Sequence, residues 1–177
     1  MIMKKTGKAV VMIVMMLAIV LVGCGSKEVV WKEFTSQDGT VSISMNEEWQ
    51  LEDIGAGSEG WVAAFTEDGS EGILVMQAAK SIFGANIVGM DDWKALIESS
   101  YPMSEMEEID NPTISGMDIS GTYSCVVTAE GVKGAGRILY GETEYAYYSI
   151  LYVAPKIDSA KAEYYNNVCT SFKETAN

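Results

Sequence analysis

The chain has 177 residues, with 25 acidic and 12 basic side chains, a formal net charge of −13 and no histidine. Without histidine, this chain alone cannot form a Ser-His-Asp or Cys-His catalytic site or a histidine-ligated metal site. Its acidity disfavours binding to nucleic acid, to phosphate-rich ligands and to anionic lipid headgroups, because like charges repel.

Residues 1–23 have the features of an export signal that is removed after use. Three lysines, Lys4, Lys5 and Lys8, precede an apolar run that extends from residue 9 to residue 22. A helix needs about 20 apolar residues to cross a bilayer, so this shorter run is typical of a signal peptide. The positive charges predict that the N-terminus stays in the cytoplasm and that the following chain is exported.

The sequence Leu21-Val22-Gly23-Cys24 closes the apolar run and resembles the lipobox of bacterial lipoproteins. In that family the peptide is cleaved between the positions of Gly23 and Cys24, and the cysteine thiol carries a diacylglycerol. In some members the freed amine is acylated too. Two or three acyl chains, at about 0.8 kcal/mol for each buried CH₂, hold a protein stably at a membrane. The alternative is an uncleaved signal anchor in which Cys24 has no role.

We therefore expect three regions: a signal peptide at 1–23, a lipidated cysteine with a short tether at 24–30, and a single domain at 31–174. The expected location is extracytoplasmic, with the lipid on Cys24 anchoring the protein to the cell membrane. At about 3.3–3.6 Å per residue, the tether keeps the domain close to the bilayer.

The sequence after the tether predicts short strands separated by turns. The expected strands are 31–34, 41–45, 61–65 and 73–79, and then, after a helix, 114–129, 132–140 and 145–154. The Asp38-Gly39 and Asp68-Gly69 steps predict tight turns, because glycine adopts the positive φ angles that such turns need. Residues 145–154 are apolar on both faces, which is typical of a central strand covered on both sides.

Helices are expected at 92–101 and from about 159 to 172. Asp91 is placed to cap the first helix, which Pro102 ends, and Asp158 is placed to cap the second. The order strands, helix, strands, helix, with hairpin connections and no repeated βαβ unit, predicts an α+β fold. We expect a largely antiparallel sheet flanked by helices.

Residues 34–45, Phe-Thr-Ser-Gln-Asp-Gly-Thr-Val-Ser-Ile-Ser-Met, followed by Glu48-Trp49, resemble the opening of the PsbP-like superfamily, which includes the PsbP, Mog and DcrB proteins. The last helix, ending Thr170-Ser171-Phe172, resembles that family's C-terminal helix. The family's usual proline before the tryptophan is absent, and Met45-Asn46 stands in its place. The resemblance implies an α/β/α sandwich and a binding or assembly role, with no shared catalytic residues.

Two motifs are not expected to form sites. The glycines of 55–60 match G-x-G-x-x-G, but a strand follows them where a dinucleotide fingerprint needs a helix, so no nucleotide is expected. The acids Glu105, Glu107, Glu108 and Asp110 would point to different sides of an extended segment. They predict a solvated edge, and we expect neither a metal nor a cofactor.

Aromatic residues provide the candidate binding surface. Tyr140, Tyr145 and Tyr147, with Trp61, could line a groove for a protein or a small ligand, although aromatic residues are also common in ordinary strands.

The remaining cysteines, Cys125 and Cys169, lie on apolar faces of a predicted strand and a predicted helix. The first interpretation is that both are buried thiols. The alternative is a Cys125–Cys169 disulfide, which can form in an exported protein.

These observations favour a membrane-anchored extracytoplasmic module that binds or assembles without catalysis. One alternative is a small envelope hydrolase, which needs two converging carboxylates with separated pKa values. Another is an accessory ligand-binding lipoprotein of a transport system.

Overall fold

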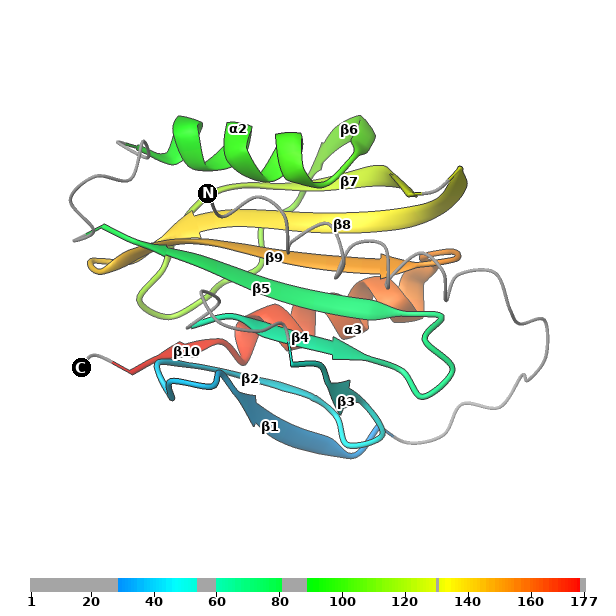
Figure 1. Cartoon of the computed structure of the whole chain (residues 1–177), viewed down its shortest axis with the longest axis horizontal. Helices are drawn as coiled ribbons and strands as arrows, with labels where there is room; N and C mark the ends of the chain where they lie inside the picture. Colours follow the sequence, from blue (N-terminus) through cyan, green and yellow to red (C-terminus); the bar gives the residue numbers. More distant parts are fainter. Residues whose placement is uncertain (1–28, 54–59, 81–88, 130, 176–177) are drawn as a thin grey trace.

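The computed structural model describes residues 29–53, 60–80, 89–129 and 131–175 (Figure 1). The predicted signal peptide, the lipobox with Cys24 and most of the glycine-rich loop therefore lie outside the described residues. No helix within the described ranges is both long and apolar enough to span a membrane.

The larger sheet of the described chain has seven strands in the order β3-β4-β5-β9-β8-β7-β6, and every neighbouring pair is antiparallel. The strands are β3 (Gln50–Leu51), β4 (Val62–Phe65), β5 (Gly72–Ala79), β6 (Met103–Ile109), β7 (Asp118–Ala129), β8 (Val132–Glu142) and β9 (Ala146–Ala154). The sheet consists of two meanders, β3-β4-β5 and β6-β7-β8-β9, which join where β5 pairs with β9 (Figure 1). Almost all of β9 is buried, as its two apolar faces predicted.

A smaller sheet in the described residues contains β1 (Trp31–Thr35), β2 (Val41–Asn46) and β10 (Lys173–Glu174), in the order β1-β2-β10. The short β10, which the sequence analysis did not predict, pairs with the start of β2. The backbone N–H of Thr175 extends that pairing by donating to the carbonyl of Thr40 at 2.8 Å. The two ends of the domain are thereby held together (Figure 1).

The helices of the described residues are α2 (Met90–Ser100) and α3 (Ser159–Thr170). Asp158 caps α3 as predicted, because its carboxylate accepts a 3.0 Å hydrogen bond from the N–H of Lys161. The predicted cap on α2 is wrong: Gly89 occupies the cap position without a side-chain bond, and Asp91 lies in the first turn. There its negative charge still favours the positive end of the helix dipole.

Apolar side chains form one layer on each face of the larger sheet. On one face, Trp93 and Ile97 of α2 pack against residues such as Leu151. On the other face, α3 and the smaller sheet cover the strands together, and Tyr165 is fully buried there. The expected α+β fold with antiparallel sheets is confirmed. More of the described residues are in strands than in helices. The sequence predicted that helices flank the sheet, but on one face β2 covers the strands together with α3.

The acidic segment around Glu105 forms the edge strand β6. Glu105 has a φ of 55° and lies where the pairing of β6 with β7 shifts register, which is the geometry of a β-bulge. Glu105, Glu107 and Glu108 are exposed, in agreement with the predicted solvated edge.

Candidate functional site: an acidic pocket beside the β4–β5 hairpin

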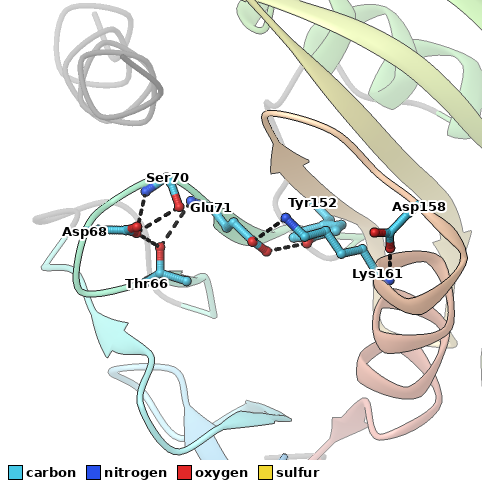
Figure 2. Close-up of polar contacts among 7 residues, drawn as sticks. All are labelled: Thr66, Asp68, Ser70, Glu71, Tyr152, Asp158 and Lys161. Atoms are coloured by element: carbon cyan, nitrogen blue, oxygen red, sulfur yellow. Dashed lines mark hydrogen bonds and ion pairs between the residues drawn. The ribbon is translucent and has the colours of Figure 1, made fainter. Parts of the chain in front are cut away.

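The turn between β4 and β5 is organised by the carboxylate of Asp68 (Figure 2). Its Oδ1 atom accepts hydrogen bonds from the hydroxyl of Thr66 at 2.7 Å and from the N–H and the hydroxyl of Ser70 at 2.9 and 2.8 Å. Gly69 supplies a φ of 65°, which closes the turn. Partial burial raises the pKa of Asp68, but these hydrogen bonds outweigh it and leave the pKa below its usual value.

The same construction occurs in the turn between β1 and β2. Asp38 accepts from the hydroxyls of Ser36 and Thr40 at 2.6 and 2.8 Å, and Gly39 has a φ of 77°. The two turns share the pattern Ser/Thr-x-Asp-Gly-Thr/Ser. Each turn therefore holds an ionised carboxylate in a fixed position at the end of a hairpin.

Glu71, at the end of the β4–β5 turn, connects the hairpin to β9 and α3 (Figure 2). Its carboxylate accepts a short hydrogen bond from the hydroxyl of Tyr152 and lies 2.6 Å from the ammonium group of Lys161. Burial raises the pKa of Tyr152, and the charge of Glu71 raises it further, so Tyr152 is a neutral donor. The β4–β5 hairpin thus meets β9 and α3, which come about 80–90 residues later in the chain, at this carboxylate.

A pocket of about 470 Å³ opens between this hairpin and the end of β2. It is lined by Asn46, Glu48, Trp49, Thr66, Glu67, Asp68, Ser70 and Glu71. Four of these residues carry a carboxylate, and acidic groups in a cleft favour a positively charged ligand.

Trp49 forms the aromatic part of the pocket wall. It is 6% exposed and stacks with Tyr164 of α3 at a centroid distance of 5.9 Å. The Tyr164 hydroxyl accepts a 3.0 Å hydrogen bond from the N–H of Asn46, and its ring also stacks with Trp31 at 5.3 Å. This packing fixes the wall of the pocket against α3.

The residues of the candidate aromatic surface differ in exposure, although Tyr140, Tyr147 and Trp61 all belong to the apolar layer on one face of the larger sheet. Tyr140 is fully buried, so it cannot belong to a binding surface, whereas Tyr145 is 51% exposed after β8. Tyr147 is half-buried with the ammonium group of Lys80 5.0 Å from its ring centroid. Trp61 is half-buried and donates from Nε1 to the carbonyl of Gln77 at 2.9 Å. A binding role for Tyr145, Tyr147 and Trp61 stays a prediction.

Cys125 and Cys169 are free and buried, and they lie in the apolar layers on opposite faces of the larger sheet. The alternative of a Cys125–Cys169 disulfide is therefore not the arrangement in this structure. Burial raises the pKa of Cys125 to about 11 and that of Cys169 to about 12, so both are protonated thiols at neutral pH.

The sequence predicted a turn at Asp68-Gly69 and a family resemblance at Glu48-Trp49, but it did not predict that these residues share a pocket. The repeated Ser/Thr-x-Asp-Gly-Thr/Ser pattern is a signal that could have identified Asp38 and Asp68 as ordered carboxylates. No group of three or more His, Cys, Asp or Glu side chains in the described part of the chain is arranged to hold a metal ion.

Comparison with solved structures supports the fold. The solution structure of cyanobacterial PsbP (CyanoP) from Synechocystis sp. PCC 6803 is similar, with a TM-score of 0.53 and 12% identity, over 88% of this chain and 99% of that one. A crystal structure from Bacteroides thetaiotaomicron VPI-5482 gives a TM-score of 0.52 and 16% identity over 82% of this chain. The match covers 48% of that longer chain.

These likenesses bear out the expected PsbP-like fold, and at such identities they show the fold alone. No protein-family model matches the chain. A search of curated proteins gives no match either.

Proposed function

We propose that this chain is a lipid-anchored extracytoplasmic protein whose PsbP-like domain binds or assembles without catalysis of its own. The signal-like leader, the lipobox-like sequence at 21–24 and the fold of the similar structures support this proposal. The acidic pocket is the binding site. Its ligand is a positively charged group, carried by a small molecule or by a protein partner.

The carboxylates in the pocket wall are the observation that supports a positively charged ligand. The carboxylates of Glu67 and Asp68, on the hairpin turn, and the Glu71 carboxylate, which Lys161 contacts, lie around a cavity large enough for a small polyamine or one long basic side chain. Trp49, which is 6% exposed, supports this wall from behind through its stacking with Tyr164.

The lowered pKa of Asp68 favours binding of a cation over acid catalysis by this residue. A carboxylic acid that protonates a leaving group needs a raised pKa. The shifts resolved for carboxyl groups in the described residues are all downward, at Glu33, Asp38, Asp68 and Asp158. The carboxylate of Asp68 therefore keeps its negative charge at neutral pH.

Calorimetric titration with spermidine at low ionic strength tests the pocket. The double variant Glu48→Gln/Glu67→Gln removes two charges from the wall and leaves the Asp68 turn intact. Each charge is worth about 1 kcal/mol at 4 Å in a water-like medium, so we expect spermidine to bind roughly tenfold to thirtyfold more weakly.

The matched control is Glu107→Gln/Glu108→Gln, which removes two exposed charges from β6, at the opposite edge of the larger sheet. This control should change the affinity little. Equal weakening by both double variants would mean that spermidine responds to net charge and not to the pocket, and it would refute the proposed site.

The anchor has a separate test. Cys24→Ala should abolish membrane association and the mass added by lipid, whereas Cys125→Ala, which removes a buried thiol, should change neither. An unchanged membrane fraction and an unchanged mass for Cys24→Ala would refute the anchor and leave the pocket untouched.

A further inference from the structure

Two adjacent apolar residues are exposed where the tether enters the domain. Val30 is 52% exposed and Trp31, the first residue of β1, is 42% exposed. Single exposed apolar residues are common on protein surfaces. These two are neighbours, and one of them is a tryptophan with its large apolar surface.

The backbone and ring contacts hold this pair in a fixed position. Val30 accepts a 2.8 Å hydrogen bond from the N–H of Glu47, and Trp31 pairs with Asn46 of β2. The Trp31 ring stacks with Tyr164 of α3 at a centroid distance of 5.3 Å and an interplanar angle of 19°. The exposed edge of Trp31 is therefore presented by a rigid domain.

The length of the tether limits how far this corner can lie from the anchor. Six residues, 25–30, separate Cys24 from Trp31. A fully extended chain gains about 3.3–3.6 Å per residue, so Trp31 lies within about 25 Å of the Cα atom of Cys24. With a tether shorter than this maximum, Trp31 would lie at the headgroup region of the membrane in which Cys24 is anchored.

We propose that Val30 and Trp31 insert into the interfacial region of the bilayer, so that the domain rests on the membrane at this corner. The inference rests on the lipid anchor of the proposed function. Tryptophan is enriched at membrane–water interfaces because its ring is largely apolar and its N–H is polar. The net negative charge of the chain makes zwitterionic lipid the fitting surface.

Fluorescence quenching tests the contact with the lipidated protein in phosphatidylcholine vesicles whose acyl chains are brominated near the headgroup. We expect part of the tryptophan emission to be quenched and the Trp31→Phe variant to lose that quenched part. Phenylalanine retains an aromatic ring against Tyr164, and equal near-ultraviolet circular dichroism bands from the other tryptophans would show that the domain is folded. Trp61→Phe is the matched control and should retain the quenching.

Each outcome of the test has one meaning. Equal emission from brominated and unbrominated vesicles, with the protein still bound to them, overturns the inference and leaves the anchor intact. Protection of Trp31 by a second copy would appear as a concentration-dependent dimer with unquenched emission, and it would also overturn the inference. A Cys24→Ala variant that still floats with the vesicles and has an unchanged mass would refute the lipid anchor on which the inference rests.

Discussion

Replacing Glu71 with alanine should destabilise the domain more than replacing any other carboxylate of the pocket. Glu71 contacts both Tyr152 and Lys161, so its removal breaks a hydrogen bond and an ion pair at the same time. It also leaves the Tyr152 hydroxyl in a largely buried position without its acceptor.

The expected magnitude follows from the exposure of the partners. The ion-pair side chains are 19% exposed for Glu71 and 34% for Lys161, so we assign the pair about 0.5–1 kcal/mol, near the value for surface pairs. A hydrogen bond to a charged group contributes about 1.5–3 kcal/mol. Glu71→Ala should therefore lower the free energy of unfolding by about 2–4 kcal/mol, which corresponds to a fall in Tm of roughly 4–16 °C for a domain of this size.

Urea denaturation, followed by circular dichroism, measures the loss. Glu67→Ala in the same turn is the matched control, and because Glu67 is exposed we expect a change within about 0.5 kcal/mol. Double-mutant cycles with Lys161→Met and Tyr152→Phe should give couplings of about 0.5–1 and 1–2 kcal/mol. A loss below about 0.5 kcal/mol for Glu71→Ala, or no coupling to Tyr152, would refute the reasoning.

Other contacts give predictions that can be checked by simple measurements. Because the folded pKa of Asp68 is lowered, its stabilisation is present above the unfolded pKa of about 3.9 and is lost as the pH falls through the folded pKa. The stability difference between the wild type and Asp68→Asn should therefore shrink in acid, and a constant difference would contradict this. Cys125 and Cys169 should resist alkylation at pH 8 in the folded protein, and both should react in urea without reductant. A disulfide between them would prevent the reaction in urea. Gly136→Ala should cost about 1–3 kcal/mol, because its Cβ would lie 2.7 Å from the sulfur of Cys125 and 2.8 Å from Cγ2 of Val127. Cys125→Ala should relieve only part of that cost, since the contact with Val127 remains.

Local features of the sequence were sufficient for most of the elements. The Asp38-Gly39 and Asp68-Gly69 steps fix their turns through contacts within six residues, so the turns could be predicted. The cap of Asp158 on α3 is also local. β10 is different, since its two residues form a strand only through pairing with β2, some 130 residues earlier in the chain. No local pattern encodes that pairing.

The candidate site was harder to predict, because its residues converge only after folding. Glu71 and Lys161 are ninety positions apart, and neither belongs to a sequence motif from which the other could be predicted. Tyr140 shows a related difficulty. Both faces of the larger sheet are covered, so side chains on either face of a strand are buried. The alternation of side chains along β8 therefore does not tell whether Tyr140 is exposed.

The junction of β5 with β9 has a consequence for how the chain folds. The paired residues Ile73 and Tyr152 are 79 positions apart, so the two meanders cannot join into one sheet until β9 has been synthesised. Until then β5 presents an unpaired edge, which is the kind of surface that aggregates. The pairing of β2 with β10 comes later still along the chain. A ribosome-bound or truncated chain that lacks residues 173–175 therefore leaves one edge of β2 unpaired. Because β2 and β10 are far apart in sequence, their pairing should form slowly once these residues have been synthesised.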